Sequence, residues 1–71
     1  MNDLVLKRMV NGKEETISGK CLVLRDQGEW LGVLRVINES VFDILRCHRE
    51  GDKLMVVEGF RVGEAVPYFL S

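Results

Sequence analysis

The sequence predicts a small, mainly β domain with one helix, a five-stranded barrel in which the helix lies between the third and fourth strands. Three observations indicate this: a length of 71 residues, short branched apolar runs separated by turn signals, and one stretch with a helical apolar period. Such a length is about half of an ordinary domain, so residues 1–71 are expected to form one unit.

The first three strands are predicted between residues 4 and 37. Residues 4–10 are rich in branched side chains, and the Asn11-Gly12 pair that follows is a strong hairpin signal. A second strand is expected to start at Lys20, after Gly19, and to end in the turn formed by residues 25–28. Residues 30–37 then form the third strand.

Side-chain alternation assigns faces to the second and third strands. The residues expected to point inward are Leu22, Leu24, Trp30, Leu34 and Val36. The residues expected to point outward are Cys21, Val23, Arg25, Leu31, Val33, Arg35 and Ile37. This outward face is unusually apolar.

Residues 41–50 are predicted to form a three-turn helix. Val41, Ile44, Leu45 and His48 share one stripe with the spacing i, i+3, i+4, i+7, and charged residues gather opposite. The flanking residues suit a helix, because serine at position 40 is a favourable N-cap and glycine at 51 a favourable C′ residue. The alternative is a small SH3-like barrel in which this segment is a strand, although each strand face would then mix charged and apolar side chains.

Two more strands complete the predicted order. Residues 54–57 are expected to form a buried strand, Gly59 to mark a bulge or bend, and residues 65–70 to form a last strand with Pro67 at a sheet edge. Three strands, a helix and two strands is the order of the OB-fold.

Two segments resemble the anticodon-binding-type (tRNA-anti) OB domains. Residues 19–28, Gly-Lys-Cys-Leu-Val-Leu-Arg-Asp-Gln-Gly, resemble the second strand and turn of this family, and residues 51–59, Gly-Asp-Lys-Leu-Met-Val-Val-Glu-Gly, resemble its fourth strand. The resemblance implies single-stranded nucleic-acid binding, with Arg25 at the arginine of the family's Leu-Arg-Asp. Cys21 stands where the family has a stacking aromatic, and the family's glutamine on the third strand has no counterpart here.

The predicted nucleic-acid site combines basic residues for phosphates with aromatic residues for base stacking. Its members are Lys20, Arg25, Arg35, Phe60, Arg61 and Tyr68. The alternative is that the arginines are solvated strand residues with buried stems and that the aromatic residues belong to the core. A formal charge of -1 and a pI of 5.7 argue against tight nonspecific binding, since that affinity comes mainly from phosphate neutralisation.

A second hypothesis is a protein-interaction module, either a homo-oligomer or a small subunit of a larger nucleic-acid-processing complex. Its predicted interface is the apolar outward set Leu31, Val33 and Ile37, because exposed apolar patches mark partner surfaces. The two hypotheses share the same barrel.

The sequence offers little for catalysis, cofactors or a membrane. Cys47 and His48 are adjacent, and neighbouring helix residues point about 100° apart, so they do not form a catalytic pair. We expect no enzyme activity, no metal and no cofactor, since no carboxylate pair, phosphate loop or metal-ligand spacing is present. No apolar run approaches the ~20 residues of a membrane span. The first residues lack the pattern of a signal peptide, so the expected location is intracellular and cytoplasmic.

Overall fold

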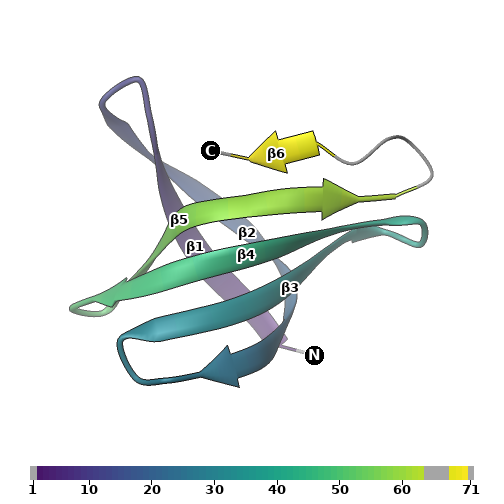
Figure 1. The fold of residues 1–71 in the computed structure, drawn as a ribbon. Helices are drawn as coiled ribbons and strands as arrows, with labels where there is room; N and C mark the ends of the chain where they lie inside the picture. Colours follow the sequence, from purple (N-terminus) through teal and green to yellow (C-terminus); the bar gives the residue numbers. More distant parts are fainter. Residues whose placement is uncertain (1, 64–67, 71) are drawn as a thin grey trace.

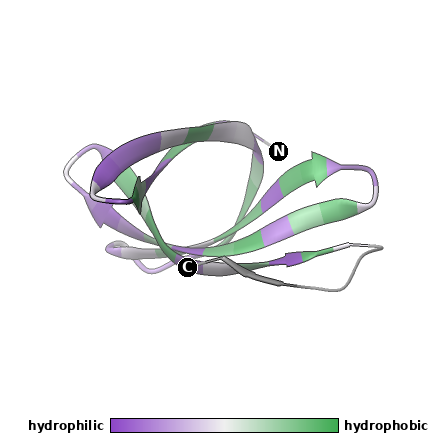
Figure 2. Cartoon of the chain, turned by 90° about the horizontal axis from the view of Figure 1, so that it is seen from above, coloured by the Kyte–Doolittle hydropathy of each residue, from purple (hydrophilic) through white to green (hydrophobic). Residues whose placement is uncertain are grey.

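The computed structural model describes residues 2–63 and 68–70, which form a small all-β closed barrel (Figure 1). Its strands are β1 (Asn2–Val10), β2 (Lys13–Asp26), β3 (Trp30–Asn38), β4 (Val41–Glu50), β5 (Lys53–Val62) and β6 (Tyr68–Leu70). Each strand pairs antiparallel with the next, and β1 also pairs in parallel with β5 between Lys7 and Met55. This last pairing closes a ring of five strands, which curls round on itself when seen from above (Figure 2).

Short turns with left-handed residues connect the strands. Asn11 and Gly12 have φ angles of 51° and 79°, the conformation that a two-residue type I′ hairpin requires. The predicted hairpin at these residues is therefore confirmed. The predicted turn at residues 25–28 is also present, since the Asp26 carboxylate accepts a 2.8 Å hydrogen bond from the Gly28 N–H and the Gln27 N–H donates to the Trp30 carbonyl at 2.9 Å.

The second strand begins earlier than predicted and serves two neighbours. Residues 13–21 of β2 pair with β1, and residues 21–26 pair with β3. The strand therefore starts at Lys13 rather than at Lys20, and Gly19 lies within it. A register shift between Val23 and Arg25 accompanies the change of partner.

The predicted helix at residues 41–50 is wrong, because this segment is β4. Asp43, Leu45 and Cys47 alternate as buried residues and face the barrel interior, while the residues between them are more exposed. The charged Asp43 on the inward face broke the expected strand alternation and left the helical spacing as the better pattern. No helix occurs among the described residues, and none is available to cross a membrane.

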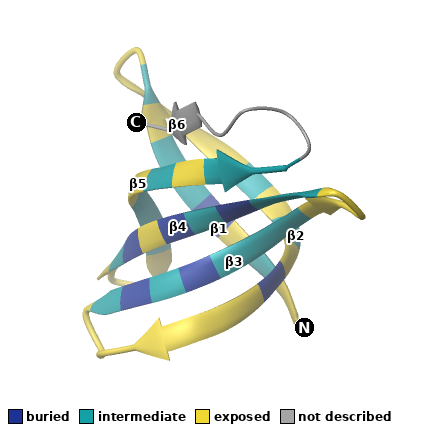
Figure 3. Cartoon of the chain, turned by 45° about the vertical axis from the view of Figure 1, so that its right-hand side comes forward, coloured by how far each residue is buried: buried dark blue, intermediate teal, exposed yellow. Residues whose placement is uncertain are grey.

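The predicted faces of the second and third strands are wrong for most residues, although Val23, Arg25 and Ile37 are exposed as predicted. The buried core consists of Leu6, Cys21, Leu31, Val33, Leu45 and Cys47, with Leu4, Ile17, Leu54 and Val56 packed against it (Figure 3). Leu22 and Leu24, expected inside, are about half exposed, at 46% and 51%. Trp30, Leu34 and Val36, also expected inside, are only partly buried and alternate with the core residues of β3. Both faces of these strands are apolar, so alternation alone left the inward face undetermined, and a shift of one residue exchanges the faces.

The fifth strand differs from its prediction in burial and in the place of its irregularity. Residues 54–56 are partly buried, and Val57 is exposed rather than buried. The register shift falls at Val57, not at Gly59, because Arg46 pairs with Glu58 and Cys47 with Val56. Gly59 instead allows close approach, since an added Cβ would lie 2.6 Å from the Leu45 Cδ2 atom. Pro67 lies outside the described residues, and of the predicted last strand the described part is β6.

Candidate functional site

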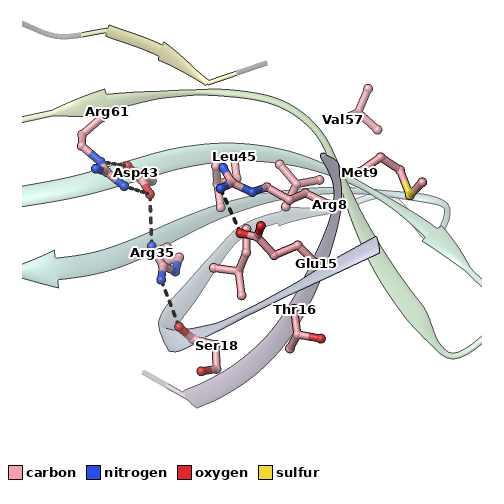
Figure 4. Close-up of a pocket in the computed structure, with 12 residues that line it drawn as sticks. Arg8, Met9, Glu15, Thr16, Ser18, Arg35, Asp43, Leu45, Val57 and Arg61 are labelled. Atoms are coloured by element: carbon pink, nitrogen blue, oxygen red, sulfur yellow. Dashed lines mark hydrogen bonds and ion pairs between the residues drawn. The ribbon is translucent and has the colours of Figure 1, made fainter. Parts of the chain in front are cut away.

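A buried aspartate organises one end of the barrel interior. The Asp43 side chain is 3% exposed and receives hydrogen bonds from two arginines on neighbouring strands. Arg61 Nε donates to Oδ1 at 2.7 Å and Arg61 Nη2 to Oδ2 at 3.2 Å, while Arg35 Nη1 donates to Oδ2 at 3.3 Å. Figure 4 shows both arginines pointing toward this carboxylate. Two charged donors compensate the removal of a buried carboxylate from water.

Strand register brings the three residues together. Asp43 on β4 stands opposite Arg35 on β3 and opposite Arg61 on β5, so all three side chains share the inward face. Arg35 also donates from Nη2 to the Ser18 carbonyl at 3.1 Å, and its Nε lies 3.2 Å from where a Cβ on Gly19 would be. A glycine at position 19 therefore gives the Arg35 side chain room to lie flat on β2.

A second ion pair lies at the same end of the barrel. Arg8 on β1 pairs with Glu15 on β2 at 3.0 Å, and these two residues stand opposite each other in the hairpin. The side chains that line this end include Arg8, Glu15, Arg35, Asp43 and Arg61, which we call the charged mouth (Figure 4). They surround a cavity of about 410 Å³ with apolar walls from Leu45 and Val56.

A different site lies on the outer face of β3, β4 and β5. The Arg46 guanidinium carbon is 4.0 Å from the centre of the Trp30 ring, and the His48 ring is 4.6 Å from it at an interplanar angle of 54°. Trp30 and His48 are a cross-strand pair, which explains the ring contact. A guanidinium at this distance over an indole is a cation–π contact.

This stack forms one wall of a cavity of about 590 Å³ that we call the outer groove. Its lining side chains include Arg25, Trp30, Ile44, Arg46, Glu58 and Phe60. Arg46 also pairs with Glu58 at 3.2 Å, and Phe60 is 39% exposed. Gly32 on β3 pairs with Arg25 on β2 and with Arg46 on β4. Because it has no side chain, the centre of the groove between these two arginines is open.

Four of the six predicted nucleic-acid residues divide between these two sites. Arg25 and Phe60 line the outer groove, whereas Arg35 and Arg61 meet at Asp43 in the charged mouth. Lys20 is exposed on β2 and lines neither cavity. The Tyr68 backbone pairs with Arg61, and its side chain lies outside the description. The prediction therefore brought together residues that the barrel separates into an inner and an outer set.

The predicted partner interface is corrected in the same way. Leu31 and Val33 are core residues, 4% and 0% exposed, because they lie on the inward face of β3. Only Ile37, at 37%, is exposed as predicted, and it is the extra residue at a register shift between β3 and β4. The apolar residues on the outer face are different ones: Leu22, Leu34, Ile44 and Phe60 pair in sequence across β2 to β5.

The two cysteines are buried and free. Burial raises the pKa of the Cys47 thiol from 9.0 to about 11, with a smaller contribution from Cys21. Burial also raises the pKa of Cys21, although the nearby Arg35 charge opposes this. Both side chains therefore stay protonated thiols at neutral pH and pack as small apolar groups. Among the described residues, no group of three or more His, Cys, Asp and Glu side chains is placed to hold a metal ion.

Two site features escaped prediction from the sequence. Arg8 was treated as part of an ordinary strand, and its signal was the inward parity it shares with Leu4 and Leu6. The Trp30–Arg46 stack was missed because the two residues are 16 positions apart and Arg46 was assigned to a helix. The contact can be recognised in the sequence only when β3 is known to pair with β4.

Comparison with known proteins gives no relative. No protein-family model matches the chain, and neither the curated proteins nor the solved structures contain a match.

Proposed function

We propose that the barrel binds single-stranded nucleic acid weakly, through the outer groove. The observation that carries this proposal is the meeting of two aromatic rings and two arginines, Trp30, Phe60, Arg25 and Arg46, around one open cavity. Single-stranded nucleic acids are bound by aromatic and guanidinium faces on which bases stack, together with positive charges near the phosphates. A volume of about 590 Å³ has room for a nucleobase.

The residues of the outer groove have distinct roles in binding the nucleic acid. Phe60 offers an exposed ring for a base, and the Trp30–Arg46 stack offers a second planar surface. Arg25 is exposed at the rim, where it reaches a phosphate. Glu58 beside Arg46 and the net charge of -1 keep the electrostatic attraction low, so we expect weak binding that falls with added salt.

Fluorescence anisotropy of labelled oligonucleotides at low salt tests this function. Phe60→Leu keeps the apolar volume and removes the ring, and it is expected to weaken binding by about 1 to 3 kcal/mol, the contribution of one base stack. Arg25→Gln is expected to weaken binding and reduce the salt dependence. Lys13→Gln, an exposed residue of the β1–β2 hairpin outside the groove, is the control with the same change of charge. Absence of binding at micromolar protein, or equal effects of Arg25→Gln and Lys13→Gln, rejects the proposal.

A second candidate function is self-association through the outer apolar row Leu22, Leu34, Ile44 and Phe60. The row favours it because it continues across four strands, with Leu22 46% and Phe60 39% exposed. A 71-residue domain buries a smaller fraction of its unfolded chain's surface than a larger domain does, so a second copy would add stabilising area. Sedimentation at several concentrations decides: a dimer that Leu22→Lys dissociates supports this function, and a monomer throughout rejects it.

The type of barrel is part of the proposal. Strands that are consecutive in the chain, from β1 to β5, lie side by side in the barrel. The closed five-stranded barrel supports an OB-like barrel. The strand order and the strand at residues 41–50 favour the SH3-like alternative, because an OB-fold is a Greek-key barrel, in which a fourth strand returns to lie beside the first. A single-strand binding function is compatible with either barrel, since it depends on the groove residues.

A further inference from the structure

The charged mouth contains buried hydrogen-bond donors that lack an acceptor. Arg8 Nε and Arg35 Nε are both buried, and neither has a hydrogen-bond partner among the residues that the structure describes. Both arginines line the same cavity of about 410 Å³. A buried N–H group without an acceptor costs free energy, so an acceptor that enters this cavity gains more than it would at a hydrated arginine.

The charges of the mouth favour an anion. Among the described residues that line the cavity, three are arginines, Arg8, Arg35 and Arg61, and two are carboxylates, Glu15 and Asp43, so their side chains sum to one positive charge. Asp43 is 3% exposed and is held from two sides, so it is fixed in place. Glu15 is 50% exposed, and its one ion pair within the described part of the chain is with Arg8, so it is the carboxylate that is easily displaced.

We propose that the charged mouth binds a small oxyanion of the phosphate or carboxylate class, with Arg8 and Arg35 as its donors. A guanidinium presents its N–H groups in a planar fork that matches two oxygen atoms of such an anion. The incoming anion takes the position at Arg8 that the Glu15 carboxylate now occupies. This site lies inside the barrel end and shares none of its residues with the outer groove apart from Leu45, so it is independent of the proposed nucleic-acid binding.

Titration of the ¹⁵N-labelled protein tests the site, with inorganic phosphate and acetate as probes and chloride keeping the ionic strength constant. Saturable shifts of the Arg8 and Arg35 Nε–H signals, with the Arg25 and Arg46 signals unchanged, are the expected result. Response to phosphate alone assigns a phosphate site, and response to acetate as well assigns a general oxyanion site. Shifts that do not saturate, or that are equal in all four arginines, overturn the proposal.

Variants of the Arg8–Glu15 pair separate a site from a general charge effect. Arg8→Gln is expected to weaken phosphate binding about tenfold, as for loss of one charge-assisted hydrogen bond. Glu15→Gln is expected to tighten it several-fold, because it removes the competing carboxylate. Lys7→Gln is the control for Arg8→Gln, and Glu14→Gln is the control for Glu15→Gln. Each control residue precedes the tested residue in the chain, carries the same charge and does not line the cavity. Equal effects of Glu15→Gln and Glu14→Gln, or no weakening by Arg8→Gln, overturn the assignment.

Discussion

Replacement of Asp43 by asparagine is the most direct test of how the barrel interior tolerates charge. Asparagine has nearly the same shape as aspartate but no charge, so Asp43→Asn leaves Arg35 and Arg61 facing each other without their shared carboxylate. The amide also places an NH₂ group where one carboxylate oxygen accepted hydrogen bonds. The change therefore removes the negative charge that Arg35 and Arg61 share inside the barrel.

The expected loss follows from the burial of the three side chains. Removal of one partner of a fully buried ion pair costs about 3 to 5 kcal/mol. Arg35 and Arg61 are 19% and 29% exposed, so water screens part of the unbalanced charge, and we expect a loss of about 2 to 3 kcal/mol. The free energy of unfolding of a chain of this length is roughly 4 to 10 kcal/mol, so the variant loses a large share of its stability.

Urea unfolding followed by far-ultraviolet circular dichroism measures this loss. Glu58→Gln is the control, because it removes a carboxylate from an exposed pair with Arg46 at 3.2 Å, and exposed pairs contribute less than about 1 kcal/mol. If Asp43→Asn and Glu58→Gln lower the urea midpoint equally, the structural role assigned to the buried carboxylate is wrong.

Three further predictions concern the core, a turn and the thiols. Gly59→Ala is expected to cost about 1 to 3 kcal/mol, since its Cβ would lie 2.6 Å from a Leu45 methyl and 2.8 Å from the Ile44 carbonyl oxygen; Gly32→Ala, whose nearest contact is 3.8 Å, should unfold at or near the wild-type urea midpoint. Asn11→Val is expected to lower the thermal midpoint more than Asn11→Gly, because the φ of 51° is costly for a branched residue. Because the pKa of Cys47 is raised to about 11, the folded protein holds this proton more tightly than the unfolded chain does. The contribution of this thiol to the free energy of unfolding is therefore constant below pH 9.0 and falls between pH 9.0 and 11. Cys47→Ala should show a shallower decline over that range in urea unfolding, and an equally steep decline would contradict the assignment.

Local turn chemistry in this chain was predictable, and the direction of the side chains was not. Asn11-Gly12 specified its hairpin because few residue pairs accept two left-handed conformations. Gly51 also has a positive φ of 63°, but a glycine of this kind ends a helix as readily as it turns a hairpin. The signal was therefore correct about the backbone and uninformative about the element before it.

The helix prediction failed because one inward charge has its partners on other strands. The Asp43 partners are Arg35 and Arg61, 8 and 18 positions away along the chain. Without the strand pairing, an aspartate between apolar residues indicates a solvent-facing position. The same lack of pairing information hid the Trp30–Arg46 stack and assigned the two Asp43-bound arginines to phosphates.

The closure of the barrel depends on a narrow seam. Neighbouring strands are joined by extended ladders of paired residues, whereas the parallel strand pairing of β1 with β5 has one register pair among the described residues, Lys7 with Met55. Hairpins form from residues close in the chain, whereas this contact joins distant segments and bears the entropic cost of closing the ring. In hydrogen exchange, amide protons of β1 and β5 beside this pairing should show a lower free energy of opening than amide protons within the hairpins. The barrel is then expected to open by separation of β1 from β5, which exposes its interior to solvent while the hairpins between consecutive strands stay paired.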